Sequence, residues 1–168
     1  MRDLHTYAEI CLKEVEAVGI PHGDISEFTI NTKAKTRFGQ CKKLPNGKYT
    51  ISISNVLLDE SLCPDDKSLK DTIIHEILHS CKDCMNHGKK WKWYAGLMNR
   101  KYGYSISRCA SSAESNIMKQ ANPTAYKYKL ICTKCGHVYL KQRMCAAVKN
   151  PSCYSCGYCN GTLRAESI

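Results

Sequence analysis

The sequence predicts an α+β protein in two parts, a domain of helices and strands over residues 1–108 and a small β domain over residues 125–168. Helical and strand periodicities both occur in the first part, which is long enough to bury one core of ordinary size. The roughly forty residues at the C-terminal end hold two Cys-x-x-Cys pairs separated by twenty residues. That spacing is typical of zinc ribbons.

The first part begins with a helix over residues 3–18, because apolar side chains recur on one helical face until a glycine and a proline stop the pattern. Alternation of apolar and polar residues predicts strands at residues 28–30 and 49–53. Asn46-Gly47 is a favourable hairpin turn between residues 37–44 and the second of these strands. We expect the strands to form a small antiparallel sheet.

Two more helices complete the first part. One is predicted over about residues 66–82, and the other over about residues 88–101 with an apolar face. That face carries Trp91, Ala95 and Met98. Residues 109–124 are rich in serine and end in Asn-Pro, so they are interpreted as a linker to the second part.

The helix over residues 66–82 contains the motif His75-Glu76-Ile77-Leu78-His79. A spacing of four residues places the two histidines one turn apart, where both imidazoles can reach one tetrahedral Zn²⁺. Glu76 then lies beside the metal, where it can take a proton from a zinc-bound water and pass it to the leaving amine. The apolar stripe lies on the other side of the helix, so the motif faces a cleft, and the pattern predicts metal-assisted amide hydrolysis.

A catalytic zinc usually has three protein ligands, and the predicted third ligand is His87. It lies in a turn after the helix, where the chain can reverse and return to the metal. Glu114 is the competing third ligand. A closed structural site with no open position is a further alternative, although it would leave Glu76 without a role; its ligands would be His79, Cys81, Cys84 and His87.

Twelve cysteines would suggest disulfides in a secreted protein, but the N-terminal residues are charged and amphipathic rather than signal-like. No apolar run approaches membrane-spanning length. We therefore expect a cytoplasmic protein without a membrane partner, in which the cysteines bind metal or remain buried thiols.

The predicted zinc ribbon has one clear pair of ligands and one ambiguous pair. Cys132 and Cys135 form the first pair. For the second, Cys153 with Cys156 fits the spacing as well as Cys156 with Cys159. The segment is too short and polar to fold by apolar burial alone, so zinc would supply the missing free energy. The expected cofactors are two Zn²⁺ ions, one catalytic and one structural.

The positive charge is concentrated in the second part. Residues 119–168 hold eight Lys or Arg against one acid, Glu166, and so carry +7 of the formal net charge of +10. Cations interleaved with aromatic rings suggest a surface for single-stranded DNA, although a solvated face with tyrosines covering a metal core is the alternative. The aromatic residues are Tyr126, Tyr128, Tyr139, Tyr154 and Tyr158.

Together these motifs resemble the SprT-like metalloproteases, the family that includes the DNA-protein crosslink protease Spartan. The resemblance covers most of the chain, whose size is closer to bacterial or phage members. It rests on YTISISNVLL at residues 49–58, HEILH at 75–79, His87-Gly88 with Trp91 and Met98-Asn99 behind it, and YSCGYCNGTL at 154–163.

The resemblance implies a zincin-like domain with an N-terminal helix, a small antiparallel sheet and the HExxH helix, followed by a zinc ribbon. It implies that Glu76 is the general base and resolves the ribbon ambiguity against Cys153. The implied zinc ligands are His75, His79 and His87 in the first domain and Cys132, Cys135, Cys156 and Cys159 in the ribbon.

The expected function is therefore that of a zinc-dependent endopeptidase that acts on DNA-associated or DNA-crosslinked proteins, in DNA-protein crosslink repair, with the ribbon binding DNA. A DNA-independent metallopeptidase and a non-catalytic zinc protein that binds nucleic acid are the alternatives. No oxyanion donor is identified. Tyr94 and Tyr102 are candidates only because they follow the motif in sequence.

Overall fold

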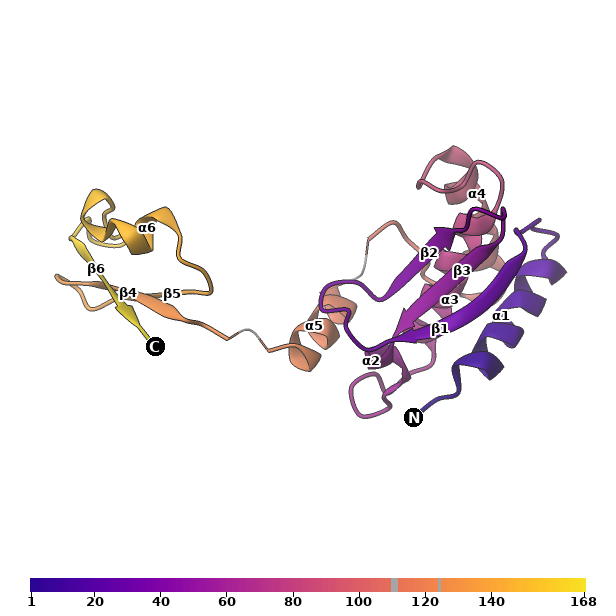
Figure 1. Cartoon of the computed structure of the whole chain (residues 1–168), viewed down its shortest axis with the longest axis horizontal. Coiled ribbons are helices and arrows are strands. Elements are labelled where there is room, and N and C mark those ends of the chain that lie inside the picture. Colours follow the sequence, from indigo (N-terminus) through magenta and orange to yellow (C-terminus); the bar gives the residue numbers. More distant parts are fainter. Residues whose placement is uncertain (110–111, 124) are drawn as a thin grey trace. The chain divides into compact units, whose positions relative to one another are not determined.

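The computed structural model describes residues 1–109, 112–123 and 125–168, apart from the side chains of residues 112–114. The chain divides into two compact units, Met1–Asn122 and Pro123–Ile168. Figure 1 shows both units, coloured from the N-terminus to the C-terminus. No helix among the described residues is long and apolar enough to span a membrane.

Three long helices of the first unit confirm the predicted ones to within two residues at each end. They are α1 (Leu4–Ala17), α3 (Lys67–Ser80) and α4 (Lys89–Tyr102). Helix α1 begins at Asp3, whose carboxylate accepts a hydrogen bond from the Thr6 amide and so satisfies a free N–H of the first turn. Helix α4 ends at Gly103, whose φ of 72° is the left-handed conformation that glycine adopts without strain.

The sheet of the first unit contains β1 (Ile25–Asn31), β2 (Gly39–Lys43) and β3 (Tyr49–Ser54) in the order β1-β3-β2. The predicted hairpin between β2 and β3 is confirmed as an antiparallel pair. The prediction of an all-antiparallel sheet was wrong, because β1 runs parallel to β3. Strand β3 carries the fully buried Ile51 and Ile53, so it takes the central position, and residues 32–38 lead from β1 to the opposite edge.

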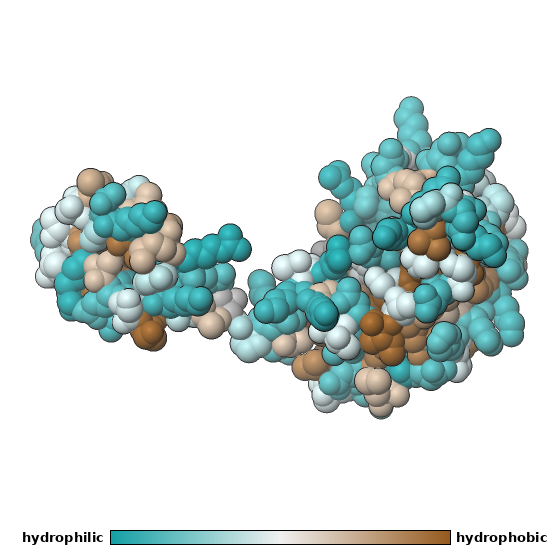
Figure 2. All heavy atoms as spheres, viewed as in Figure 1, coloured by the Kyte–Doolittle hydropathy of each residue, from teal (hydrophilic) through white to brown (hydrophobic). Residues whose placement is uncertain are grey.

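The core of the first unit lies where α3 packs against the sheet and α1 packs against α3. Figure 1 shows these helices together on one side of the sheet. The apolar stripe of α3 is fully buried, while Figure 2 shows mainly hydrophilic residues around a small hydrophobic area on the visible surface of this unit. The fully buried residues of the stripe are Leu69, Ile73, Ile74, Ile77 and Leu78.

The linker predicted over residues 109–124 contains a helix instead of irregular chain. Helix α5 (Ser112–Ala121) belongs to the first unit and contacts the short helix α2 (Asn55–Leu58). Met118 is buried, and Ile117 packs against the main core. These two apolar residues explain the helix, while Asn122 and Pro123 mark its end.

The second unit is a three-stranded antiparallel sheet, as expected of a ribbon. Its strands are β4 (Tyr128–Cys132), β5 (Val138–Lys141) and β6 (Leu163–Ser167) in the order β5-β4-β6. A short helix α6 (Ala146–Lys149) and a 3₁₀ turn η1 (Pro151–Cys153) lie between β5 and β6. The core around Cys156 is small and largely sulfur, so apolar burial alone is insufficient for stability.

Arg2 ties the start of α1 to the beginning of α3, and we expect its loss to destabilise the first unit. Its side chain is 5% exposed, forms an ion pair with Asp66 and donates to the carbonyls of Leu57, Cys63 and Pro64. Arg2→Met would remove the ion pair and the hydrogen bonds that the guanidinium donates, which should lower the free energy of unfolding by about 2 kcal/mol.

The measurement is denaturant unfolding followed by tryptophan fluorescence, since both tryptophans lie in the first unit. The control is Glu60→Ala, which removes an ion pair with the N-terminus whose partners are 63% and 60% exposed. It should change stability by less than about 0.5 kcal/mol. Equal effects of the two substitutions would contradict the anchoring role of Arg2.

Candidate metal centres and active site

Three imidazoles meet at one point in the first unit. Helix α3 supplies His75 and His79, and the turn before α4 supplies His87. The Nε2 atom of His75 lies 3.2 Å from that of His79 and 3.0 Å from that of His87. Nitrogen ligands of a tetrahedral zinc ion are separated by about 3.3 Å, as follows from Zn–N bonds of about 2.0–2.1 Å. The predicted set is therefore brought together with the spacing that zinc requires.

The chain fixes which nitrogen of His79 faces this cluster. Its Nδ1 lies 2.7 Å from the carbonyl oxygen of Cys84, so Nδ1 carries the proton and Nε2 keeps its lone pair. A turn holds that carbonyl, because the Cys84 amide donates to the Cys81 carbonyl at 3.1 Å and Asp83 has a φ of 66°. The Cys84 backbone, rather than its thiol, therefore supports the site.

The alternative of a closed Cys₂His₂ site does not form among the described residues. The thiols of Cys81 and Cys84 lie outside the three-histidine group. Both cysteines are buried, and burial raises the pKa of the Cys81 thiol to about 12. The other competing ligand, Glu114, has a side chain outside the described part of the chain.

Trp91 forms an apolar floor beneath the three imidazoles. The centroid of its ring system lies 4.7 Å from the His75 ring, 5.6 Å from the His79 ring and 4.6 Å from the His87 ring. Its burial was predicted from the apolar face of α4, but its contact with all three histidines was not. Trp91 Nε1 is buried without a hydrogen-bond partner among the described residues.

Burial also sets the protonation of the histidines. It lowers the pKa of His75 to about 4, with smaller contributions in the same direction from His79 and His87. Burial is likewise the main reason that the pKa values of His79 and His87 are lowered. Neutral imidazole is the form that binds a metal ion, so the site is ready for ligation at neutral pH.

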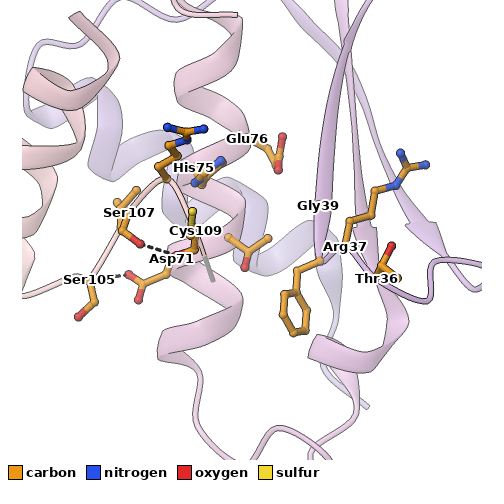
Figure 3. Close-up of a pocket in the computed structure, with 13 residues that line it drawn as sticks. Thr36, Arg37, Gly39, Asp71, His75, Glu76, Ser105, Ser107 and Cys109 are labelled. Carbon is orange, nitrogen blue, oxygen red and sulfur yellow. Dashed lines mark hydrogen bonds between the residues drawn. The ribbon is translucent and has the colours of Figure 1, made fainter. Parts of the chain in front are cut away.

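Glu76 extends from α3 toward strand β2, as Figure 3 shows. It is 7% exposed, and burial raises its pKa to about 7, against the opposing effects of the Cys41 backbone amide and the Arg37 cation. A divalent cation on the histidines would lower this pKa again. The carboxyl group is therefore placed to exchange a proton near neutral pH.

Gly39 allows β2 to approach this carboxylate. A Cβ atom at this position would lie 2.6 Å from both Cγ and Oε1 of Glu76, closer than any real contact. No prediction singled out Gly39, although a glycine within a strand pattern is a known sign of close backbone approach.

A cavity of about 240 Å³ opens beside His75 and Glu76. Its walls are residues 36–39, helix α3 and residues 105–109, which Figure 3 shows on either side of the helix. Asn99 holds the last of these segments by two hydrogen bonds with the Ile106 backbone, at 3.0 and 2.9 Å. Asp71 accepts a third from the Ser105 amide at 3.0 Å. No sequence motif had assigned a role to this segment.

The two tyrosines considered as oxyanion donors do not line the cavity. The Tyr102 hydroxyl donates to the carbonyl of Glu14, a residue of α1, at 3.4 Å. Tyr94 is 6% exposed and contacts the Trp93 ring. Neither tyrosine is therefore positioned to act as an oxyanion donor at this cavity.

The second unit brings four thiols together. The Sγ atoms of Cys132 and Cys159 are 3.5 Å apart, and those of Cys135 and Cys156 are 3.6 Å apart. Sulfur ligands of a tetrahedral zinc ion are separated by about 3.8 Å, given Zn–S bonds of about 2.3 Å. Cys153 lies outside this group. The geometry thus fits the ligand set that the family resemblance implied.

A local contact favours the thiolate form of Cys156. Hydrogen bonding from the Tyr139 hydroxyl is the main cause that lowers the pKa of Cys156 to about 6. Thiolate is the form that binds zinc. Gly161 lets the chain pass close by, since a Cβ there would lie 2.9 Å from the Cys132 sulfur.

The fold and these clusters define an α+β protein with a candidate three-histidine metal centre beside a buried glutamate and a candidate four-cysteine zinc site. A model of the SprT-like family matches residues 12–110, and the chain belongs to this family. Protein SprT-like of Bacillus subtilis (strain 168) is 25% identical to it over 145 residues, which cover 84% of this chain and 90% of that protein.

Metal analysis of purified protein should find two zinc ions per chain. His87→Ala should reduce the content to one, because two imidazoles bind zinc weakly, and Cys159→Ser should also reduce it to one by breaking the ribbon site. The matched control Cys153→Ser should keep both ions. Loss of an ion in Cys153→Ser or in Cys81→Ser would contradict these ligand sets.

Metal-free protein should reveal the burial of Glu76 through the pH dependence of stability. The pKa of the Glu76 carboxyl group is about 7 in the folded chain against an ordinary value of 4.5, so the folded state binds the proton more tightly. The free energy of unfolding should therefore fall as pH rises from about 4.5 to about 7. The side chain of Glu76→Gln cannot ionise. In the presence of a chelator, the free energy of unfolding of this variant should therefore exceed that of the wild type by about 3 kcal/mol above pH 7.

Chemical unfolding followed by tryptophan fluorescence at a series of pH values measures this difference. The exposed Glu9→Gln provides the control and should follow the wild-type curve. If the free energies of unfolding of Glu76→Gln and the wild type change in parallel between about pH 4.5 and pH 7, the carboxyl group is not buried as described.

Proposed function

We propose that this protein is a zinc-dependent endopeptidase that cleaves proteins associated with or crosslinked to DNA, and that its ribbon binds single-stranded DNA. The observation that carries the peptidase proposal is the convergence of three neutral imidazoles beside the buried Glu76, at a cavity that a substrate can enter. Membership of the SprT-like family supports the same chemistry.

His75, His79 and His87 would hold the catalytic zinc ion, and the four ribbon cysteines would hold the structural one. When bound, the catalytic ion lowers the pKa of water and polarises the scissile carbonyl. Glu76 accepts a proton from water as the water oxygen adds to the carbonyl carbon. The C–N bond then breaks while Glu76 returns the proton to the nitrogen, and the products are a carboxylic acid and an amine.

Strand β2 offers a way to align the substrate. Among the described strands it pairs only with β3, so its other edge has no strand partner, although the Cys41 amide interacts with Glu76. An extended peptide could add to that edge, a common mode of peptide recognition. Gly39 brings this strand against Glu76, so the peptide would be held near the general base. Binding of this kind requires the substrate backbone to be extended, so it favours unfolded or flexible segments of the substrate.

The charge and aromatic surface of the ribbon support the DNA proposal. Tyr158 is 76% exposed, and its ring lies 4.2 Å from that of His137, which offers a stacking surface for bases. Lys129 and Arg164 both pair with Glu166, so these two cations are partly neutralised. The remaining cations have no acidic partner in the described part of the ribbon; they are Lys127, Lys134, Lys141, Arg143 and Lys149.

A DNA-independent peptidase remains the second candidate function. The first unit by itself contains the three histidines, Glu76 and every described residue that lines the cavity. Nothing in the chemistry of peptide hydrolysis then requires DNA, and the ribbon would serve as a stabilising cap.

The proposed function predicts cleavage that depends on Glu76 and is increased by DNA. Full-length, zinc-loaded protein is incubated with a histone, with and without single-stranded DNA, and the fragments are resolved on a gel. Glu76→Gln is the matched variant, since it keeps the size of the side chain but cannot accept the proton. It should abolish cleavage with its zinc content unchanged.

The ribbon variant Tyr158→Ala should lower DNA affinity by about 1–3 kcal/mol, the range for one stacked base, and should reduce only the DNA-stimulated part of cleavage. Cleavage that is equal with and without DNA would support the DNA-independent peptidase. Absence of cleavage in every condition, together with intact DNA binding, would leave a non-catalytic zinc protein as the better description.

A further inference from the structure

Arg108 has a position that the proposed mechanism has not used. It lines the cavity of about 240 Å³ that contains His75 and Glu76. It also lines a second cavity, of about 360 Å³, whose other residues are Asn86, His87 and Gly88. The same side chain therefore borders the three-histidine centre both on the side of the general base and on the side of the third histidine.

The backbone at Arg108 is fixed, while its guanidinium group is available. Asn99 and Asp71 anchor the segment on one side of it, and the Ser107 hydroxyl donates to the Cys109 carbonyl at 2.6 Å. The Arg108 side chain is exposed and forms no hydrogen bond or ion pair with any described residue.

Peptide hydrolysis needs a cation or hydrogen-bond donor at such a place. As the water oxygen adds to the carbonyl carbon, negative charge develops on the carbonyl oxygen, and it disappears again when the C–N bond breaks. Donors aimed at that oxygen are among the largest contributions to catalysis. An arginine is always charged and offers several N–H groups in one plane, which suits an oxyanion.

We propose that Arg108 is a catalytic residue that donates hydrogen bonds to the substrate carbonyl oxygen and stabilises the charge that develops on it. This inference rests on the proposed peptidase function. Tyr94 and Tyr102 do not border the cavity, and Figure 3 shows Arg37 directed away from His75. Arg108 is the remaining cation that lines the wall of the described cavity.

The test compares Arg108→Ala, Arg108→Lys and the control Lys92→Ala in full-length protein. Lys92 is an exposed cation that lines neither cavity, so it controls for the loss of one positive charge. Steady-state cleavage of a peptide substrate gives kcat and KM. Calorimetry measures binding of a phosphinate peptide, whose anionic tetrahedral group mimics the charged adduct, and metal analysis measures zinc content.

Arg108→Ala should lower kcat/KM by about 10²–10³-fold, mainly through kcat, the loss seen when one oxyanion donor is removed. It should weaken phosphinate binding by a similar factor and keep both zinc ions. Arg108→Lys should recover part of each loss, and Lys92→Ala should remain within about threefold of the wild type.

Retention of kcat/KM and phosphinate affinity within threefold in Arg108→Ala would overturn the inference while leaving the peptidase function intact. A loss confined to KM would overturn it too, because ground-state binding is not oxyanion stabilisation. If wild-type protein neither cleaves the peptide nor binds the phosphinate, the proposed function fails first and the inference fails with it.

Discussion

The first unit is organised around the close approach of three imidazole rings. The Nε2 atom of His75 lies 3.2 Å from that of His79 and 3.0 Å from that of His87. The Cys84 carbonyl accepts from Nδ1 of His79, so His79 presents its unprotonated nitrogen to the cluster. The fold of α3, the Cys81–Cys84 turn and the start of α4 together maintain this arrangement, in which one metal ion could be bound by all three nitrogens.

The packing around the three imidazoles helps to hold them in this arrangement. Trp91 excludes water below the rings and keeps the imidazoles neutral, while β2 closes over Glu76 only because position 39 has no Cβ. The apolar stripe of α3 fixes the helix against the sheet, so the polar side of the same helix is held at the cavity. Core packing and site geometry therefore depend on one helix with two chemically different faces.

The sequence was sufficient for the features set by local spacing. Helices α1, α3 and α4, the hairpin at Gly47, the three histidines as a group and the first ribbon pair all follow from periodicity or motif spacing. The parallel pairing of β1 and the closure at Gly39 depend on contacts between distant residues. Helix α5 was missed because its polar ends suggested a linker, while its stability comes from Met118 packing in the first unit.

The two units solve the problem of metal binding in different ways. In the ribbon, a core composed mainly of Cys132, Cys156 and Leu163 is too small to fold by apolar burial, so zinc and folding should be strongly coupled. The first unit has a large aliphatic core that does not include the histidines. The metal sites of the two units therefore differ, because the three histidines lie on elements that a large apolar core already holds in place.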